Sequence, residues 1–413
     1  MLSVREARDA ILAQVEPLGT ERVSLLDAVG RVSAESVLAS RQQPPWDNSA
    51  MDGYAVRAED LLGARVDAPV RLRVLEDLMA GCVPTQTVGA GETSRIMTGA
   101  PVPPGANAII KVELTRSLQR DEVEILAAVP EGNDIRRAGE DQRVGDLLLS
   151  AGTLLRPAEI AVLASAPRAF VRVYRRPVVA ILATGDELAE PDEVPHPGQI
   201  INTNSYGLAA MVQALGGIAR VLPVAHDGVE ALQATFREAR GADVILSSGG
   251  VSVGEHDFVK EALEGLGMQL GFWKVKMTPG KPLAFGRWGE TPVFGLPGNP
   301  VSSLVSFELF VRPALLRMAG HTRIYRRLLR ATMEDSVGKR PGMPHFLRVT
   351  LREEQGRWYA SSTGAQGSGV LRSMSRAHGL AVAEESWQRV EKGTELWVMP
   401  LDEQWALSET REV

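Results

Sequence analysis

The residues best suited to phosphate chemistry form one glycine-rich stretch, 247–257, which follows the apolar run 244–246. Its glycines permit close approach of the backbone to an anion, and its serine hydroxyls add hydrogen-bond donors. The stretch lacks the Gly-Lys-Ser/Thr sequence of a P-loop, so a plain glycine-rich turn is an alternative interpretation. The acid that closes the stretch favours the phosphate-binding interpretation.

Acidic residues follow three of the predicted strands. Asp257 would begin the helix after the glycine-rich stretch, where a carboxylate can hold Mg²⁺ beside a phosphate; an ordinary helix N-cap is the alternative. Asp186 and Glu187 follow one strand, and Asp227 follows the next. Because ligands bind where the carboxyl ends of parallel strands meet, we expect these acids at one edge of a sheet. Helix capping alone does not explain this gathering.

A second loop, 295–300, follows a predicted strand and opens a helix. Asn299 is the expected N-cap and Pro300 the first helical residue. Such a helix terminus can bind an anion through its free backbone N–H groups. A well-capped helix without a ligand is the alternative.

The strand before this loop carries basic residues. The period of two of a β-strand puts Lys274, Lys276 and Thr278 on one face, and Lys281 follows shortly after. This edge is either a basic wall for an anion or a solvated charged strand.

The segment 45–139 reads as a small, mostly β insertion with two polar turns. Asp47 and Asp52 flank residues 48–51, and residues 95–101 form a hydroxyl-bearing turn, although turn chemistry alone could account for both. The six histidines of the chain have no metal-ligand spacing, so we do not expect a zinc centre.

Elements that would position these residues alternate between strand and helix after Pro177, which predicts a doubly wound α/β domain. Strands are expected at 178–182, 219–224, 244–246, 270–277 and 292–296, and helices at 204–215, 229–239, 257–266 and 300–319. Asn204 or Ser205 can cap the first of these helices. Near the start of the chain we expect helices over 3–16, with a capping box, and 25–37; after 322, short β signals predict a β-barrel.

Composition bounds the class of protein. The 413 residues suggest two or three domains, and 40 glycines with 25 prolines indicate many tight turns. The net charge of −6 excludes a global positive field for nucleic acid or an anionic membrane surface. A single cysteine, Cys82, cannot form an intrachain disulfide, and no apolar run approaches a membrane span, so we expect a cytoplasmic protein.

Together these segments resemble the MoeA family of molybdopterin molybdenumtransferases. The matching motifs occur in family order across nearly the whole chain, which makes the resemblance specific. They are DNSAMDGYA at 47–55, RIMTGAPVP at 95–103, TGDEL at 184–188, GGVSVGEHD at 249–257, PGKP at 279–282, GLPGNPVS at 295–302 and QGSG at 366–369.

The resemblance implies an elongated homodimer of multidomain α/β subunits. Each subunit would have a segmented helical and extended linker domain (1–44 and 140–172), a β-rich insertion domain (45–139), a central doubly wound α/β molybdopterin-binding domain (173–321) and a C-terminal β-barrel (322–413). This division raises the expected number of domains to four.

The implied activity is a step of molybdenum cofactor biosynthesis. Such a transferase inserts molybdate into adenylated molybdopterin, with Mg²⁺-dependent release of AMP. Its partners would be the adenylyltransferase that makes the substrate and downstream cofactor-handling proteins, and neither nucleic acid nor a membrane is expected.

The resemblance also assigns residues to roles. The catalytic set is Asp52, Thr98, Asp186, Glu187, Asp227 and Asp257, with Asp257 and Glu187 as metal ligands. The cofactor-binding set is Ser247, Ser248, Gly249, Gly250, Ser252, Gly254, Pro297, Gly298, Asn299 and Pro300. The molybdate set is Lys276, Thr278, Lys281, Pro282, Arg348 and Ser368. In the family dimer, Asp52 and Thr98 would approach the cleft of the other subunit.

One position departs from the family pattern. Many members have a lysine or arginine where this chain has Thr278, which removes a positive charge from the oxyanion pocket. Lys276, on the same predicted strand face, could partly replace it. We therefore expect molybdate affinity to depend more on Lys281 and Arg348 here.

Two alternatives belong to different classes. The α/β domain alone also resembles molybdopterin adenylyltransferases, but that family consists essentially of this one domain. A non-catalytic dimeric scaffold is the other alternative, which the retained acids and phosphate loops make less favoured.

Overall fold

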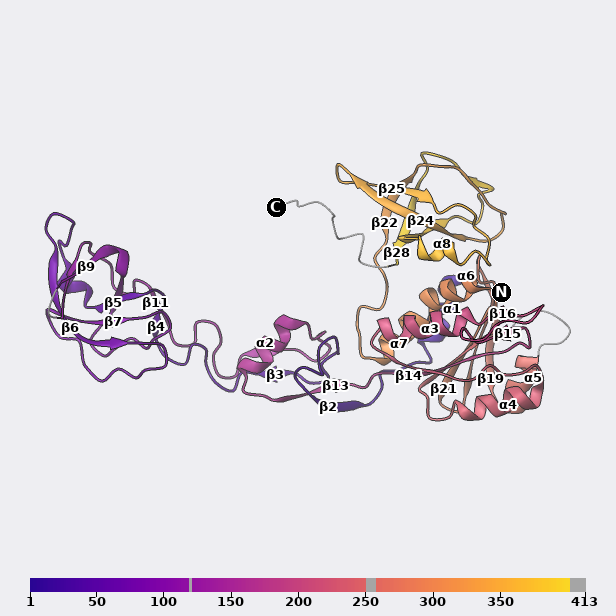
Figure 1. The fold of residues 1–413 in the computed structure, drawn as a ribbon, viewed down its shortest axis with the longest axis horizontal. Helices are drawn as coiled ribbons and strands as arrows, with labels where there is room; N and C mark the ends of the chain where they lie inside the picture. The colour runs from indigo at the N-terminus through magenta and orange to yellow at the C-terminus, as the bar shows by residue number, and fades with distance from the viewer. Residues whose placement is uncertain (119–120, 250–257, 402–413) are drawn as a thin grey trace.

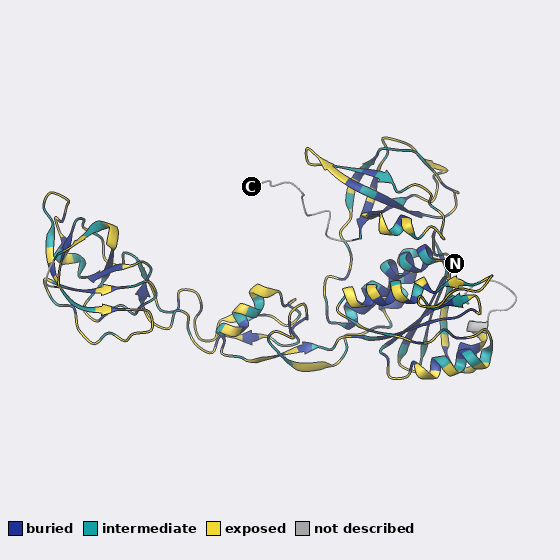
Figure 2. Ribbon diagram, viewed as in Figure 1, coloured by how far each residue is buried: buried dark blue, intermediate teal, exposed yellow. Residues whose placement is uncertain are grey.

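The computed structural model describes residues 1–118, 121–249 and 258–401 of the chain. Figure 1 shows a long molecule with a β-rich unit at one end, a narrow connecting segment, and an α/β unit beside a β-barrel at the other end. Each unit has its own buried interior, as the burial colours of Figure 2 show. Within the described residues, no helix is long and apolar enough to cross a membrane.

The α/β unit is built on a seven-stranded sheet in the order β1-β19-β20-β21-β18-β14-β17. The strands are β1 (Leu2–Ser3), β19 (Gln269–Lys276), β20 (Pro282–Trp288), β21 (Thr291–Leu296), β18 (Val244–Ser248), β14 (Val178–Ala183) and β17 (Ile218–Val221). Strands β17, β14, β18 and β21 are parallel, whereas β19, β20 and β21 are antiparallel neighbours. This arrangement confirms the predicted α/β fold, although β20 was not expected from the sequence.

Helices cover both faces of the sheet. They are α1 (Val4–Leu12), α3 (Thr203–Ala214), α4 (Val229–Glu238), α5 (Phe258–Gly265), α6 (Pro300–Ser306), the π-helical segment η3 (Phe307–Val311) and α7 (Arg312–Met318). In β14, Val179 and Ile181 pack under α1, α3, α6, η3 and α7, whereas Ala180 and Leu182 pack against α4 and α5. The strand is apolar throughout because both of its faces are covered.

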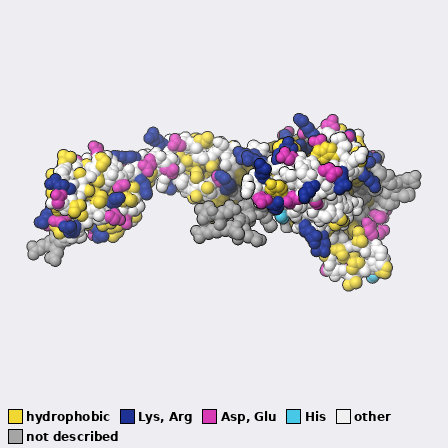
Figure 3. Space-filling view, turned by 90° about the horizontal axis from the view of Figure 1, so that it is seen from above, with side chains coloured by type: hydrophobic (Ala, Val, Ile, Leu, Met, Phe, Trp, Pro, Cys, Tyr) yellow, Lys and Arg dark blue, Asp and Glu magenta, His cyan; other side chains and the backbone are white. Residues whose placement is uncertain are grey.

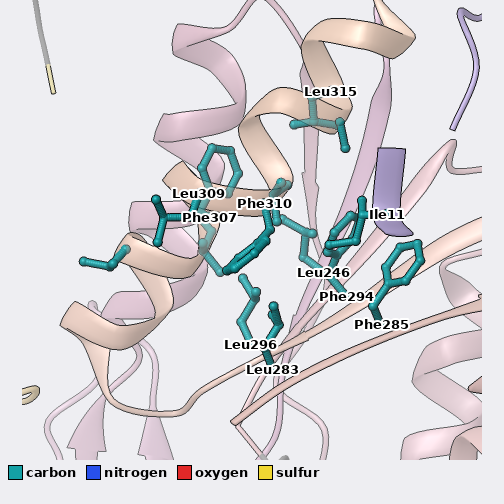
Figure 4. Packing of buried hydrophobic residues seen from close by; sticks show 14 of the residues in the cluster. Ile11, Leu246, Leu283, Phe285, Phe294, Leu296, Phe307, Leu309, Phe310 and Leu315 are labelled. Atoms are coloured by element: carbon teal, nitrogen blue, oxygen red, sulfur yellow. The ribbon is translucent and has the colours of Figure 1, made fainter. Parts of the chain in front are cut away.

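The larger core is rich in aromatic side chains. Phe285 of β20 and Phe294 of β21 lie with their ring centroids 5.0 Å apart, and Phe307 and Phe310 approach them from η3, as Figure 4 shows. Ile11 of α1 joins the same cluster, so the first residues of the chain help to close the α/β unit.

The first helix begins as the sequence predicts but is shorter. The backbone N–H of Glu6 donates to the Ser3 hydroxyl at 3.2 Å, and the Glu6 carboxylate accepts from the Ser3 N–H at 2.8 Å, which confirms the capping box. β1, the two residues before the helix, pairs in parallel with β19, a contact that no pattern in the sequence indicated.

The prediction of a helix over 25–37 is wrong. Instead of bonding within a helix, the backbone N–H of Gly30 donates to the Leu155 carbonyl at 2.8 Å and that of Ser33 donates to Thr153 at 2.9 Å. Gly30 also has a φ of +75°, which ends any helical path. The apolar spacing of this segment therefore reflects contacts with a distant part of the chain.

The chain passes twice through the connecting segment. β2 (Thr20–Ser24) pairs with β13 (Phe170–Tyr174), β3 (Val37–Leu38) pairs with β12 (Leu147–Leu149), and α2 (Pro157–Ser165) packs beside them.

The β-rich unit contains a six-stranded sheet in the order β8-β5-β7-β6-β10-β9. Its strands are β8 (Ala108–Lys111), β5 (Gly53–Val56), β7 (Glu92–Ile96), β6 (Val70–Leu78), β10 (Glu122–Ile125) and β9 (Thr115–Ser117), with the 3₁₀ turns η1 (Ala58–Leu61) and η2 (Val112–Leu114) and the separate pair β4 (Asn48–Ser49) and β11 (Ile135–Arg136). The alternating signals at 70–74 and 122–125 are confirmed as the antiparallel neighbours β6 and β10.

A closed five-stranded barrel follows the α/β unit, which confirms the predicted C-terminal β-barrel. Its strands are β22 (Leu329–Met333), β25 (Arg357–Ser362), β24 (His345–Glu354), β26 (Gly379–Ala383) and β28 (Glu395–Pro400), with the pair β23 (Val337–Gly338) and β27 (Arg389–Val390) and the short helix α8 (Arg372–Ser375).

Candidate functional site

A cleft of about 420 Å³ opens at the carboxyl ends of β14, β18 and β21. This is the edge at which open α/β sheets bind ligands. The cleft brings together residues that lie far apart in the sequence, and those singled out above are Glu187, Ser248, Gly249, Pro282, Pro297, Gly298, Asn299 and Pro300.

The first two serines of the glycine-rich stretch differ in their positions. Both are buried, but Ser248 lines the cleft and Ser247 does not, because successive strand residues point to opposite faces. Gly249 adopts a φ of +95°, and a Cβ at this position would lie 2.9 Å from the Thr184 carbonyl oxygen. Only glycine fits this close approach. Gly250, Ser252, Gly254 and Asp257 lie outside the described residues.

Three of the predicted acids lie at the same sheet edge. Glu187 lines the cleft, and Asp186 lines a neighbouring hollow of about 570 Å³ on the other side of Leu188. The Asp227 carboxylate accepts from the Thr184 hydroxyl at 3.3 Å. The structure thus gathers these acids around the loop after β14, as the sheet topology predicts.

Asp186 forms a pair with a histidine that sequence reasoning had left without a role. Its Oδ1 lies 2.9 Å from Nδ1 of His226 and also accepts from the backbone N–H of Asp227 at 3.3 Å. These hydrogen bonds, that of His226 first, lower the pKa of Asp186 below its usual value. Asp186 is therefore an ionised, exposed carboxylate at neutral pH.

The barrel holds the predicted molybdate residue Arg348 in its interior, in β24. This arginine is fully buried; its Nε donates to the Ser373 hydroxyl and its Nη2 to the Gly367 carbonyl, both at 3.1 Å. Nη1 is buried and has no hydrogen-bond partner among the described residues. Burial lowers the pKa of Arg348 to about 10, so the side chain stays charged at neutral pH. Arg348 is therefore a buried cation whose Nη1 has no hydrogen-bond acceptor among the described residues.

A loop of the barrel sits on the α/β unit beside this arginine. The carbonyl oxygen of Ser368 accepts from the N–H of Val301, at the start of α6, at 3.1 Å. Gly367, the neighbour of Ser368, holds Arg348. Of the predicted molybdate residues, Pro282 lines the cleft, Ser368 bonds to the neighbour of the cleft residue Pro300, and Arg348 lies buried behind this loop without lining the cleft.

The basic strand is used differently from the sequence-based expectation. Lys276 forms an ion pair with Glu385 of the barrel, so its charge is already balanced. The backbone of Thr278 joins the barrel, donating to Pro344 at 3.0 Å and accepting from Phe346 at 2.8 Å. Lys281 is exposed and has no ion pair within the part of the chain that the structure describes. Lys276 and Thr278 therefore help to hold the barrel against the α/β unit.

Charged side chains elsewhere are mixed in sign. On the face shown in Figure 3, lysine and arginine side chains are interspersed with aspartate and glutamate. Together with the net charge of −6, this means that an anionic ligand would depend on local cations and not on the overall charge.

His345 is a buried histidine at the start of β24, and its burial predicts that the barrel loses stability in acid. Burial, followed by the charges of Arg348 and Lys339, lowers the pKa of His345 to about 4. Between pH 6.5 and 4 the unfolded chain therefore binds a proton that the folded chain does not, and stability falls as the pH falls. We expect His345→Gln to remove about 2 kcal/mol of the loss in unfolding free energy between pH 7 and 4.5.

Urea unfolding at both pH values, followed by tryptophan fluorescence, measures this difference. The exposed His196→Gln is the matched control and should leave the acid sensitivity unchanged. Equal acid sensitivity in wild type and His345→Gln would contradict the assignment.

Asp52 and Thr98 lie together but far from the cleft of their own chain. Oδ1 of Asp52 accepts from both the backbone N–H and the hydroxyl of Thr98, each at 2.7 Å, and these bonds lower the pKa of Asp52. Both residues belong to the β-rich unit at the opposite end of the molecule in Figure 1. A single chain therefore does not bring them to the cleft.

Sequence reasoning missed Asn204 as a site residue. The structure shows that Asn202 caps α3, since its side chain accepts from the Ser205 N–H at 3.2 Å, and that Asn204 lines the cleft. The expectation that Asn204 or Ser205 is the cap is therefore wrong. Two asparagines at one helix start, of which only one can be the cap, were the available signal.

Family models match the chain in three successive regions. Residues 2–166 match the MoeA N-terminal region (domain I and II), residues 180–317 match a probable molybdopterin binding domain, and residues 330–401 match the MoeA C-terminal region (domain IV).

Individual relatives match along almost their whole length. Molybdopterin molybdenumtransferase 2 of Mycobacterium tuberculosis is 40% identical over 97% of this chain and 100% of its own length. Molybdopterin molybdenumtransferase of Nostoc sp. is 36% identical over 97% of this chain and 94% of its own length. The crystal structure of a molybdopterin biosynthesis MoeA protein from Pyrococcus horikoshii superposes with a TM-score of 0.83, at 32% identity, over 97% of this chain and 99% of that chain.

Proposed function

Since the chain belongs to the MoeA family of molybdopterin molybdenumtransferases, we propose that it inserts molybdate into adenylated molybdopterin and releases AMP. The observation that carries this proposal is the composite site. Loops at the ends of β14, β18 and β21 form a cleft, and the barrel loop that holds the buried Arg348 contacts Val301, next to the cleft residue Pro300. The cleft suits a phosphoanhydride, and the arginine suits an oxyanion.

Cleavage of the phosphoanhydride by water breaks one P–O bond, forms another to the water oxygen, releases a proton and leaves negative charge on the phosphate of AMP and on that of molybdopterin. Hydrogen-bond donors that are already in place stabilise such charge without reorganising. The Ser248 hydroxyl at the wall of the cleft is one donor, and the terminus of α6 around Asn299 and Pro300 is a second region of positive potential. We propose that these groups hold the two phosphates.

Mg²⁺ fits the donor set of this site. Magnesium is usually bound through one or two carboxylates and completes its shell with water and phosphate oxygens. The Glu187 carboxylate at the cleft wall is one such ligand, and we propose Asp257, outside the described residues, as the second. When bound, the ion would neutralise charge on the pyrophosphate. Asp186 and Asp227 are proposed to act from the same edge.

Molybdate is proposed to bind between the barrel and the α/β unit. Arg348 offers its unpartnered Nη1, Lys281 offers an ammonium group, and Ser368 and Pro282 shape the pocket. Because Lys276 is paired with Glu385 and Thr278 carries no charge, Arg348 and Lys281 are the principal cations.

A homodimer would complete each site. Asp52 and Thr98 are remote from the cleft of their own chain, so we propose that they serve the cleft of the partner. We also propose the four-domain division given above, a cytoplasmic location, and delivery of the substrate by a molybdopterin adenylyltransferase.

The direct test supplies the protein with adenylated molybdopterin, Mg²⁺ and molybdate and follows AMP. We expect AMP release to require both ions and to be lost in Asp257→Ala. A parallel reaction with molybdopterin and ATP should consume no ATP, which separates this activity from adenylyl transfer. No AMP release by folded wild-type protein, or equal release by Asp257→Ala, would overturn the proposal.

A further inference from the structure

We propose that Asn204 is a positioning residue that sets which polar groups at the phosphate end of the cleft accept hydrogen bonds and which donate them. The inference rests on the proposed function, because it assumes a phosphate-bearing ligand. Asn204 lies in the first turn of α3 and lines the cleft.

The Asn204 amide ties together two loops that come from different strands. Its Nδ2 donates to the Ser248 hydroxyl oxygen at 2.8 Å and to the Gly298 carbonyl oxygen at 2.7 Å. Ser248 ends β18, and Gly298 lies between β21 and α6. Both loops line the cleft, so one side chain fixes the distance between them.

The Gly298 carbonyl decides the orientation of the amide. A peptide carbonyl can only accept, so the atom of Asn204 that faces it must be the nitrogen and not the oxygen. The Ser248 oxygen is bonded to the same nitrogen and must therefore also accept. A serine hydroxyl has one proton, which is left to donate to another group.

Both bonds favour an anion in the cleft. Lone pairs of the Gly298 carbonyl and the Ser248 hydroxyl would repel a phosphate oxygen. The two Nδ2 protons of Asn204 form hydrogen bonds with these oxygens and reduce this repulsion. The free Ser248 proton can then point at the ligand, where a hydrogen bond to a charged oxygen is roughly twice as strong as a neutral one. Asn204 thus leaves the Ser248 hydroxyl as a hydrogen-bond donor toward the cleft.

Helix capping does not account for Asn204, since Asn202 caps α3. Nor is Asn204 fully satisfied as a structural amide, because its Oδ1 is buried without a hydrogen-bond partner in the described residues. An unsatisfied buried acceptor is a cost to folding.

Calorimetric titration of AMP into the full-length protein tests the inference. We expect Asn204→Ala to weaken AMP binding at least about tenfold, and Asn204→Asp to weaken it further because a carboxylate would accept from Ser248 and repel the phosphate. Tyr206→Phe is the matched control. Tyr206 lies on the same helix as Asn204, and its hydroxyl donates to Glu190 at 2.8 Å. AMP affinity should be unchanged in this variant.

A double-mutant cycle separates positioning from a loss of folding. If Asn204 acts through Ser248, the Asn204→Ala and Ser248→Ala losses should not add, and the double variant should bind AMP about as well as the weaker single variant. Additive losses, or unchanged affinity in Asn204→Ala, would overturn the inference while wild type still binds AMP. Failure of the wild type to bind AMP would instead count against the proposed function.

Discussion

Arg348→Met should abolish molybdate binding while leaving the fold nearly as stable as the wild type. The wild-type guanidinium is fully buried and charged, with one nitrogen unpartnered in the described structure. Removal of a charged hydrogen-bond donor to an oxyanion is expected to lower affinity at least about 100-fold. We expect no measurable AMP release, since molybdate insertion and AMP release are coupled in the proposed reaction.

The stability of this variant is predicted from two opposing effects. Methionine removes a buried charge, and replacing such a charge with an apolar side chain of similar volume is often neutral or stabilising. It also removes the bonds to the Ser373 hydroxyl and the Gly367 carbonyl, each worth about 1 to 3 kcal/mol. The unfolding free energy should therefore change by less than about 2 kcal/mol.

Two further variants make the result specific to the pocket. Arg348→Lys retains a charge but cannot donate to Ser373, Gly367 and a ligand in one geometry, so molybdate affinity should still fall at least about tenfold. Lys281→Ala should weaken molybdate binding, and all three variants should bind AMP as the wild type does. Unchanged molybdate affinity in Arg348→Met and Lys281→Ala, measured by calorimetry, would show that the pocket lies elsewhere.

The strand-end loops could be predicted because their signals are local. The apolar run of β14 requires cover on both faces, and the glycine-rich stretch after β18 requires a close turn. Gly249 shows why the composition is constrained, since a side chain there would meet the Thr184 carbonyl. Parallel pairing then places the acids after β14 at the same edge, whatever the rest of the chain does.

The partners of the basic residues could not be predicted, because they depend on contacts between remote segments. The period of a strand puts Lys276 on an exposed face but cannot reveal Glu385, more than one hundred residues later, as its partner. The same holds for β1, two residues that pair with β19. In residues 25–37 the apolar spacing suited a helix, and only the structure shows that the segment forms turns over 25–30 and then bonds to the remote residues Leu155 and Thr153.

A mixture of two inactive variants should recover activity if Asp52 serves the partner's cleft. Arg348→Met damages the oxyanion pocket of its own chain, and Asp52→Ala damages the β-rich unit at the other end of the molecule. In a heterodimer, the chain with Asp52→Ala keeps an intact pocket and receives Asp52 from its partner, so one of the two sites is complete.

Random exchange of subunits in an equal mixture makes half of the dimers mixed, which restores about a quarter of wild-type AMP release. The activity should rise with the rate of subunit exchange, because neither variant is active in its own homodimer.

As the matched control, Arg348→Met mixed with Lys281→Ala should stay near the background of the single variants, because both substitutions damage the proposed molybdate pocket. If Asp52 acted within its own chain, no dimer in the first mixture would hold a complete site, and the activity would remain at the background of the separate variants. The recovered fraction therefore distinguishes a site shared between subunits from a chain that bends back on itself.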